Sequence, residues 1–276
     1  MKVKVKRYDP ETGREGYDTF DIEPEAGMTV LDALFVIQNE HDDSLAFRYA
    51  CRGAICGSCA MLINKVPRLA CRTQVARLLD GSDTVELKPY PAVEAGLDGV
   101  QAGGDRAGDA APEWNPAEEI LIEPLPHHKV LKDLVVDIEK FFCLYRAVEP
   151  ALKPAGEIPE REFRMEAGAV TELEKYTNCI LCGSCVGACP VNSKTGEYLG
   201  PAALAKLYRF HIDPREADDD SRLLLANCAE GWWGCEFHTN CMRVCPKKVE
   251  PNVGIGSARR RLTEIGKQPP ESNKDK

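Results

Sequence analysis

Four cysteines stand close together in the second half of the chain: Cys179, Cys182, Cys185 and Cys189, the last followed by Pro190. The spacing C-x2-C-x2-C-x3-C-P is typical of thiolates that bind the irons of iron–sulfur clusters. Three thiolates two residues apart fit a tight loop around one cubane, and the fourth cysteine of such a run binds a different cluster. The run therefore predicts two clusters, each of which needs further ligands.

The first of these clusters finds its missing ligand downstream, at Cys245, which is followed by Pro246. The run has the spacing of bacterial ferredoxins, and four cysteines packed this densely disfavour a zinc site or a catalytic thiol. The predicted ligands of a [4Fe–4S] cluster are Cys179, Cys182, Cys185 and Cys245.

The second of these clusters has three cysteines available, Cys189, Cys235 and Cys241. Three thiolates predict a [3Fe–4S] cluster, which lacks the fourth iron. His238 stands where a C-x2-C-x2-C pattern would have its middle cysteine. It is an alternative fourth ligand, because imidazole binds iron in Rieske centres, but a nearby histidine more often hydrogen-bonds to a quinone, a water or a cluster sulfur.

A third group of cysteines lies near the start of the chain, in the pattern C-x4-C-x2-C with one more cysteine further on. This is the plant-type [2Fe–2S] arrangement. Gly53 and Gly57 let the backbone amides of the loop approach the sulfur atoms. Structural zinc, the alternative, normally uses two C-x2-C pairs, and this segment has one. The predicted [2Fe–2S] ligands are Cys51, Cys56, Cys59 and Cys71.

The composition agrees with a reducing compartment. The 276 residues include 13 cysteines, an odd number, and the alternating Met1-Lys-Val-Lys-Val-Lys6 predicts a strand rather than a signal peptide. No segment approaches the roughly 18 apolar residues that span a bilayer, so we expect any membrane contact to come through partners. The net charge of -9 gives no support to nucleic-acid binding.

The elements around the first cysteine loop follow a β-grasp-like order. Two strands precede a helix that begins after Thr29, where Asp32 completes a capping box. A short hairpin turns at Asn64-Lys65. Either 85–89 or 120–124 is the last strand, and we favour the second. The expected strands are 2–8, 20–22, 61–63, 66–70 and 120–124, and the expected helix is 30–40.

The fold class is therefore α+β, with two domains. Residues 1–128 are expected to form a β-grasp, plant-type [2Fe–2S] ferredoxin-like domain with an exposed Gly-, Ala- and acid-rich insertion over about 91–119. Residues 129–276 are expected to form an all-helical, bacterial-ferredoxin-like domain that carries the other two clusters. An apolar stripe over 131–142 predicts its first helix, and Pro201 predicts the start of another.

Other residues able to do chemistry have less support from the pattern. Cys143 lies on the apolar stripe and is expected to be a small buried hydrophobe, and Cys228 is expected to be structural. The pair His127-His128 is expected to lie on the surface. Trp232 and Trp233 precede Cys235 closely, so they either pack in the core or line a pocket beside the third cluster.

Nearly the whole chain resembles the iron–sulfur subunit of succinate dehydrogenase and fumarate reductase. Besides the cysteines, the resemblance is carried by specific motifs. They are Arg48-Tyr-Ala-Cys51-Arg-Gly53, Cys56-Gly-Ser-Cys59-Ala-Met61, Leu69-Ala-Cys71-Arg-Thr73, Ile122-Glu-Pro-Leu-Pro126, Lys132-Asp-Leu-Val-Val-Asp137, Tyr198-Leu-Gly-Pro-Ala202 and Tyr208-Arg-Phe210 with Ile212-Asp213.

The resemblance implies an electron-transfer role with no succinate chemistry on this chain. Electrons would pass between the FAD of a partner flavoprotein and a membrane quinone through [2Fe–2S], [4Fe–4S] and [3Fe–4S] clusters. A cytochrome b type anchor, which can carry haem, would hold the chain at the cytoplasmic face of the inner (cell) membrane. The resemblance places Pro190, His238, Trp232 and Trp233 toward the quinone.

One departure concerns the quinone. Many members carry Trp soon after the Cys-Pro that ends the ferredoxin run, whereas Cys189-Pro190 is followed here by Val191-Asn-Ser-Lys-Thr195. The missing aromatic favours menaquinone over ubiquinone. The alternative function is the iron–sulfur subunit of another flavoenzyme or of a fumarate reductase that does not use quinone.

Overall fold

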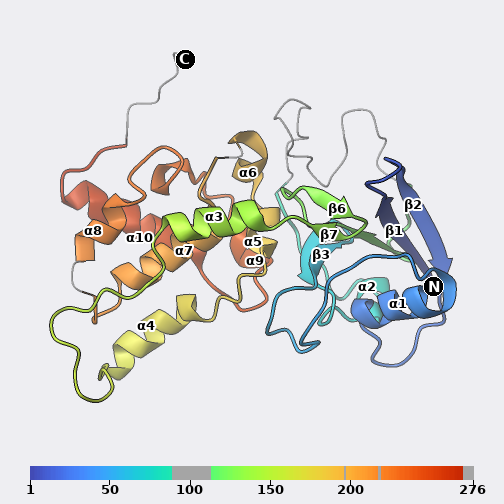
Figure 1. The fold of residues 1–276 in the computed structure, drawn as a ribbon, viewed down its shortest axis with the longest axis horizontal. Helices are drawn as coiled ribbons and strands as arrows, with labels where there is room; N and C mark the ends of the chain where they lie inside the picture. Colours follow the sequence, from blue (N-terminus) through green and yellow to red (C-terminus); the bar gives the residue numbers. More distant parts are fainter. Residues whose placement is uncertain (89–112, 196, 217–218, 270–276) are drawn as a thin grey trace, which may run out of the picture.

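The computed structural model describes residues 1–88, 113–195, 197–216 and 219–269. Most of the expected insertion at 91–119 therefore lies outside the described residues. The chain forms a sheet-containing part and a helical part, which lie side by side in Figure 1. Among the described residues, no helix has the length and apolar character needed to cross a membrane.

The sheet-containing part is built on five strands in the order β2-β1-β5-β3-β4. Strand β1 pairs with β2 antiparallel and with β5 parallel, which confirms the second segment as the last strand. The β3–β4 hairpin turns at Asn64 and Lys65, whose φ values of 48° and 61° suit the tight turn of a hairpin. The strands are β1 Lys2–Tyr8, β2 Glu15–Asp21, β3 Ala60–Ile63, β4 Val66–Leu69 and β5 Glu119–Glu123.

A helix covers this sheet and starts where the sequence predicts. Helix α1 (Val30–Val36) has a complete capping box between Thr29 and Asp32, and it continues as the π-helical turn η1 (Ile37–His41). A short helix α2 (Val75–Leu79) follows the hairpin. The apolar sides of the strands and of α1 form one buried core. Its fully buried members include Val3, Val5, Val30, Leu34, Ile37, Ile63 and Ile122.

The helical part is arranged around helix α7 (Gly200–His211), which has Pro201 in its first turn as predicted. Helix α7 contacts α3, α4, α5, α8 and α10, and the fully buried Trp232 lies in the largest core on this side. The other elements are α3 Glu139–Ala147, α4 Ala167–Thr177, α5 Ser184–Gly187, α6 Pro190–Thr195, α8 Asp219–Leu224, η2 Trp232–Gly234, α9 Asn240–Arg243 and α10 Pro251–Glu264.

The expected helix over 131–142 is wrong in its first half. Residues 130–136 form two short strands, β6 (Val130–Lys132) and β7 (Val135–Val136), and α3 begins only at Glu139. The reason is Asp133, which has a φ of 45° and accepts hydrogen bonds from Arg7, Tyr8 and Ala46. These contacts fix the segment to the first sheet. Leu134 therefore belongs to the first core, and a boundary after residue 128 stays a prediction.

Candidate metal centres

The first cysteine loop curls around the sulfur of Cys51. The backbone N–H groups of Gly53, Ile55 and Cys56 donate to Cys51 Sγ over 3.4, 3.3 and 3.3 Å. This curl needs left-handed backbone, and the φ values of Arg52 and Ala54 are 53° and 57°. N–H groups aimed at sulfur stabilise a thiolate, which is the form that binds iron.

The other thiols of this group differ in environment. A hydrogen bond from the backbone N–H of Cys51 lowers the pKa of Cys56 to about 6. Burial raises the pKa of Cys59 to about 12, and the charges of the nearby Cys71 and Cys56 thiolates also raise it. The loop and the end of the β3–β4 hairpin thus bring Cys56, Cys59 and Cys71 together. A buried thiol of this kind ionises when a metal ion supplies positive charge, so the donor set fits an iron centre.

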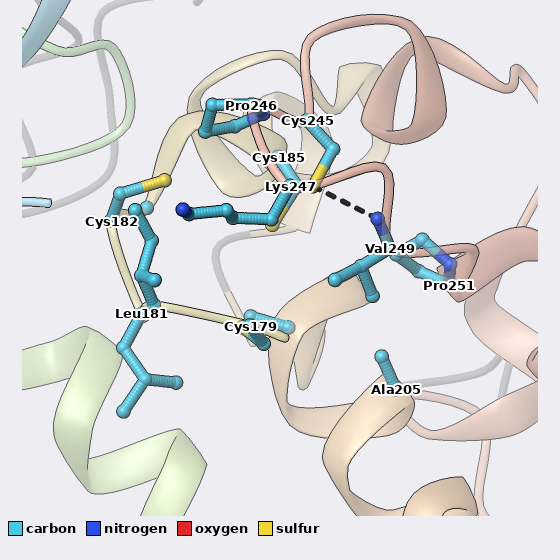
Figure 2. A pocket seen from close by; sticks show the side chains of 13 residues that line it. Cys179, Leu181, Cys182, Cys185, Ala205, Cys245, Pro246, Lys247, Val249 and Pro251 are labelled. Carbon is cyan, nitrogen blue, oxygen red and sulfur yellow. Dashed lines mark hydrogen bonds between the residues drawn. The ribbon is translucent and has the colours of Figure 1, made fainter. Parts of the chain in front are cut away.

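The second group of cysteines lines a single pocket (Figure 2). Cys179 and Cys182 come from the loop before α5, Cys185 lies in α5 itself, and Cys245 comes from the segment after α9. The pocket encloses about 410 Å³, part of it open to solvent, and Lys247 also lines it. Four thiols from two segments around one pocket are the ligand set that a cubane requires. The cysteines are Cys179, Cys182, Cys185 and Cys245.

The thiols of this pocket are buried but supplied with donors. Val249 donates its backbone N–H to Cys245 Sγ over 3.2 Å, as drawn in Figure 2. Burial raises the pKa of Cys179 and Cys245 and raises that of Cys185 well above its usual range. These sulfurs, like the buried Cys59 of the first group, need a cation to become thiolates.

The third group gathers Cys189, Cys235 and Cys241. Burial raises the pKa of Cys189 to about 11 and that of Cys241 to about 12. The charge of the nearby Cys235 thiolate also raises the pKa of both thiols. The backbone N–H of Phe237 donates to Cys235 Sγ over 3.4 Å. Three mutually close thiols fit a cluster with three protein ligands. Within the described parts of the chain, no three His, Cys, Asp or Glu side chains are arranged to hold one single metal ion.

The loops of the first two groups touch each other. Gly57 lies in the first loop with a φ of 74°, and a Cβ added there would lie 2.8 Å from Cys182 Cβ and 2.9 Å from Cys182 Cα. Ile180 and Cys182 also pack against the core of the first domain. Glycine is therefore required at this position both by the backbone and by the close approach of the second loop. The cysteine spacing alone places Gly57 only in the first loop.

The residues expected near a quinone surround the third group. His238 Nε2 lies 2.9 Å from Glu236 Oε2, so its ring has a carboxylate partner in this structure. Trp232 is fully buried and donates its indole N–H to the Leu223 carbonyl, which makes it a packing residue. Trp233 is half-buried and donates to Asn227. Pro190 is buried at the start of α6, directly after Cys189.

Two residues that the sequence did not assign to a site also lie here. Arg259, on α10, donates to the backbone carbonyls of Trp232 and Cys235, both over 2.7 Å, and so holds the segment that carries Cys235. Tyr198 is buried beside the same thiols. Neither residue belongs to a cysteine motif, and each reaches the site only through the packing of α7 and α10.

Two expectations outside these groups are wrong. Cys143 is exposed, because α3 turns the face that carries Phe141 toward the core. Arg146 donates a hydrogen bond to the Cys143 sulfur over 3.4 Å. His127 and His128 are not a surface pair. His128 is 4% exposed, and burial lowers the pKa of both histidines to about 4. Both line a pocket with Asn192 between the two parts of the chain.

Fold and cysteine geometry together define a two-domain iron–sulfur protein, and comparisons with known proteins agree. The family model of a 2Fe-2S iron-sulfur cluster binding domain matches residues 2–143, and the model of a 4Fe-4S dicluster domain matches residues 175–249. A chain of the Mycobacterium smegmatis Sdh1 complex in the apo form has the same fold, with a TM-score of 0.74, 23% identity and coverage of 98% of both chains.

Relatives in sequence identify the family. The chain is 32% identical to the fumarate reductase iron-sulfur subunit of Haemophilus influenzae, over 94% of this chain and 91% of that one. It is 33% identical to the succinate dehydrogenase iron-sulfur subunit of Paracoccus denitrificans, over 95% of this chain and 88% of that one. The chain belongs to the family of iron–sulfur electron-transfer subunits of fumarate reductase and succinate dehydrogenase, which confirms the resemblance and the fold class inferred from its motifs.

Proposed function

We propose that the chain carries electrons between the FAD of a partner flavoprotein and a membrane quinone, using three clusters. The [2Fe–2S] cluster would be held by Cys51, Cys56, Cys59 and Cys71, the [4Fe–4S] cluster by Cys179, Cys182, Cys185 and Cys245, and the [3Fe–4S] cluster by Cys189, Cys235 and Cys241. When bound, each cluster supplies a site that accepts and releases an electron.

The proposal depends most on the four thiols that line one pocket, because cubane ligation fits their number and spacing better than a zinc site or a catalytic thiol does. The polypeptide would fix the positions of the ligands, donate backbone N–H groups to their sulfurs and bury them from water. Bonds such as that from Val249 N–H to Cys245 Sγ at 3.2 Å stabilise negative charge on sulfur and thereby set the potential. The contact between Gly57 and Cys182 would keep the first two centres close.

The test combines metal analysis with spectroscopy on protein purified under anaerobic conditions. Iron and acid-labile sulfide are measured, and EPR follows the three centres during a redox titration. One cysteine is then replaced in each group: Cys51→Ser, Cys245→Ser and Cys241→Ser. Each variant is expected to lose or convert the signal of its own centre and to keep the other two.

The matched controls are Cys143→Ser and Cys228→Ser, which remove thiols outside the three groups. Both are expected to leave all three signals in place. A protein that contained zinc but no sulfide would contradict the proposal. A four-iron signal in the third centre would instead make His238 a ligand, which its pairing with Glu236 disfavours.

The partners follow from the family. We propose a flavoprotein bound near the first cysteine loop and a cytochrome b type anchor, with or without haem, near the third group. The anchor would hold the chain at the cytoplasmic face of the inner membrane. The part of the surface around Pro190, Trp233 and His238 would face the quinone, with Trp232 supporting it from the core.

The quinone itself is proposed to be menaquinone, because no aromatic residue follows Cys189-Pro190 in α6. Membranes that contain the complex are expected to turn over menaquinone analogues. Ready reduction of ubiquinone analogues, with no activity toward menaquinone analogues, would rule this choice out while leaving the electron-transfer role intact.

A further inference from the structure

A short segment of the first domain, residues 85–88, lies against the helical part, and we call it the strap. Its start is fixed at β4, where Arg68 donates to the carbonyl of Asp83 over 2.7 Å and pairs with the carboxylate at 2.6 Å. Within the strap every second side chain is half-buried, namely Val85 and Leu87. This alternation is typical of an extended segment that packs one side against the protein.

The inward side chains of the strap pack against a small core that joins the two parts of the chain. The buried members of this core are Val66 from β4, Ala188 and Val244. Two of them directly precede predicted cluster ligands: Ala188 precedes Cys189 of the third group, and Val244 precedes Cys245 of the second. The strap therefore contacts a core that includes the neighbours of ligands of two different centres.

Asn240, the first residue of α9, holds the backbone of the strap. Its Oδ1 accepts the N–H of Lys88 over 3.0 Å, and its Nδ2 donates to the Lys88 carbonyl over 3.0 Å. The same Nδ2 donates to the Ala188 carbonyl over 3.0 Å. Asn240 is 1% exposed and directly precedes Cys241. One buried amide thus joins the strap, the residue before Cys189 and the residue before Cys241.

We propose that the strap and Asn240 position the cysteines of the second and third groups, with Asn240 as the positioning residue that fixes the spacing of Cys189 and Cys241. This inference rests on the proposed function, in which these cysteines hold clusters. Through the strap, the domain that would carry only the [2Fe–2S] cluster supports the other two centres as well. Ligands held by outer hydrogen bonds and packing bind their metal more tightly, and loss of such a partner weakens the site.

The hydrogen bonds of Asn240 differ from another bond between α9 and the strap. Arg243 Nη1 donates to the Glu86 carbonyl over 2.7 Å, but this bond is exposed and water can replace it. Ala188 is fully buried, so its carbonyl would lose the Asn240 donor in a place that water does not reach. Removal of the Asn240 amide is therefore expected to displace the ligand segments.

The test is Asn240→Leu in the anaerobically purified, cluster-loaded protein with the subunits that accompany it. Leucine branches at the same carbon and removes all three hydrogen bonds. The concentration of iron chelator that halves the EPR signal of the third centre is expected to fall about tenfold, as when an outer partner of a metal ligand is lost. Before chelation that signal should broaden, because Cys189 and Cys241 would no longer keep one spacing. The signal of the first centre should keep its line shape and its resistance to the chelator.

A second variant, Leu87→Ala, tests the strap from the side of the first domain. It trims the packing against the small core and leaves the hydrogen-bonding groups of Asn240 in place, so it is expected to make the second and third signals less resistant to the chelator. The matched control is Leu79→Ala, which trims another half-buried leucine of the first domain that packs against the core of the sheet. It should lower stability and leave the second and third signals unaltered. This pair decides the matter if Asn240→Leu fails to assemble a third centre.

The outcomes separate the inference from the proposed function. A third signal with unchanged line shape and chelator resistance in Asn240→Leu overturns the positioning role. Equal behaviour of Leu87→Ala and Leu79→Ala also overturns it, because the strap would then contribute no more than general stability. Absence of a third iron–sulfur centre in the unaltered protein overturns the proposed function itself, and this inference with it.

Discussion

His127 and His128 are buried between the sheet-containing and helical parts, and this has a consequence for stability. Burial lowers the pKa of both to about 4, whereas an unfolded histidine titrates near its ordinary value of 6.5. The unfolded state therefore binds more protons than the folded state between these values. The contribution of the two neutral, buried histidines to the free energy of unfolding is fully present above pH 6.5. It is lost as the pH falls toward 4, by about 2 kcal/mol for each histidine at about pH 5.

This loss is measured by urea unfolding of the cluster-loaded protein near pH 7.5 and near pH 5. Replacing both residues, His127→Gln with His128→Gln, should flatten the difference between the two pH values. The exposed His41→Gln serves as the control and should keep it. If the double variant loses as much stability on acidification as the unaltered protein does, the two histidines are not its cause.

The same residues show what local sequence cannot predict about single side chains. The spacing of the cysteines predicted their grouping because a tight loop needs short intervals. The burial of His128 and the exposure of Cys143 depend instead on tertiary packing, that is, on which side chains face parts of the chain that are distant in sequence. His128 Nε2 lies near Gly183, more than fifty residues further along the chain, where an added Cβ would be 3.5 Å from it.

At the scale of elements, the contact between the first two cysteine loops is testable at Gly57. Gly57→Ala would place a methyl group 2.9 Å from Cys182 Cα, so one loop must move. The left-handed backbone alone costs about 1 kcal/mol or somewhat more. The overlap with the second loop should add a further 1–3 kcal/mol, as overpacking does. Chemical unfolding and the EPR signals of both centres measure the effect.

Gly81 offers a matched control for this change. Its φ of 71° is close to the 74° of Gly57, but nothing lies within 4 Å of an added Cβ. Gly81→Ala should therefore show the backbone cost alone and leave both signals unaltered. Equal losses of stability in the two variants would mean that the loops separate without cost, and that their contact is not needed.

Elements were predictable where their signals are local. The capping box at Thr29, the turn at Asn64-Lys65 and Pro201 each act within a few residues of the boundary they set. The structure of segment 130–136 was not predictable in this way, because its apolar stripe has helical spacing but a tertiary contact imposes two short strands. Asp133 accepts three hydrogen bonds from other parts of the first domain, and a helix there would lose them.

At the scale of the whole molecule, the two parts differ in how their cores are built. The first domain has one large buried core that extends from Val3 to Leu34 and Ile122. Around the second group, the cores are small. One joins Phe141, Val186 and Ala202 with Cys185, and another joins Tyr176, Ala205 and Val249 with Cys179 and Cys245. The region around the second group therefore depends more strongly on its metal ligands, whereas the rest of the helical part has its own larger core around Trp232. Periodicity in the sequence could not predict this difference.

Removal of iron should accordingly unfold the molecule unevenly. An iron chelator under anaerobic conditions is expected to raise hydrogen exchange first in α5 and α9, short helices whose ends carry cluster cysteines. Metal binding and local folding are coupled in such segments, because the ligands lose their common anchor when the metal leaves. Strands β1 and β5 should stay protected, since no cysteine of the groups lies in them and their buried side chains belong to the large apolar core of the first domain. Hydrogen exchange measured by mass spectrometry, before and after chelation, tests this directly. If β1 and β5 lost protection together with α5 and α9, the two parts would form one cooperative unit, and the contact at Gly57 would have to transmit the loss.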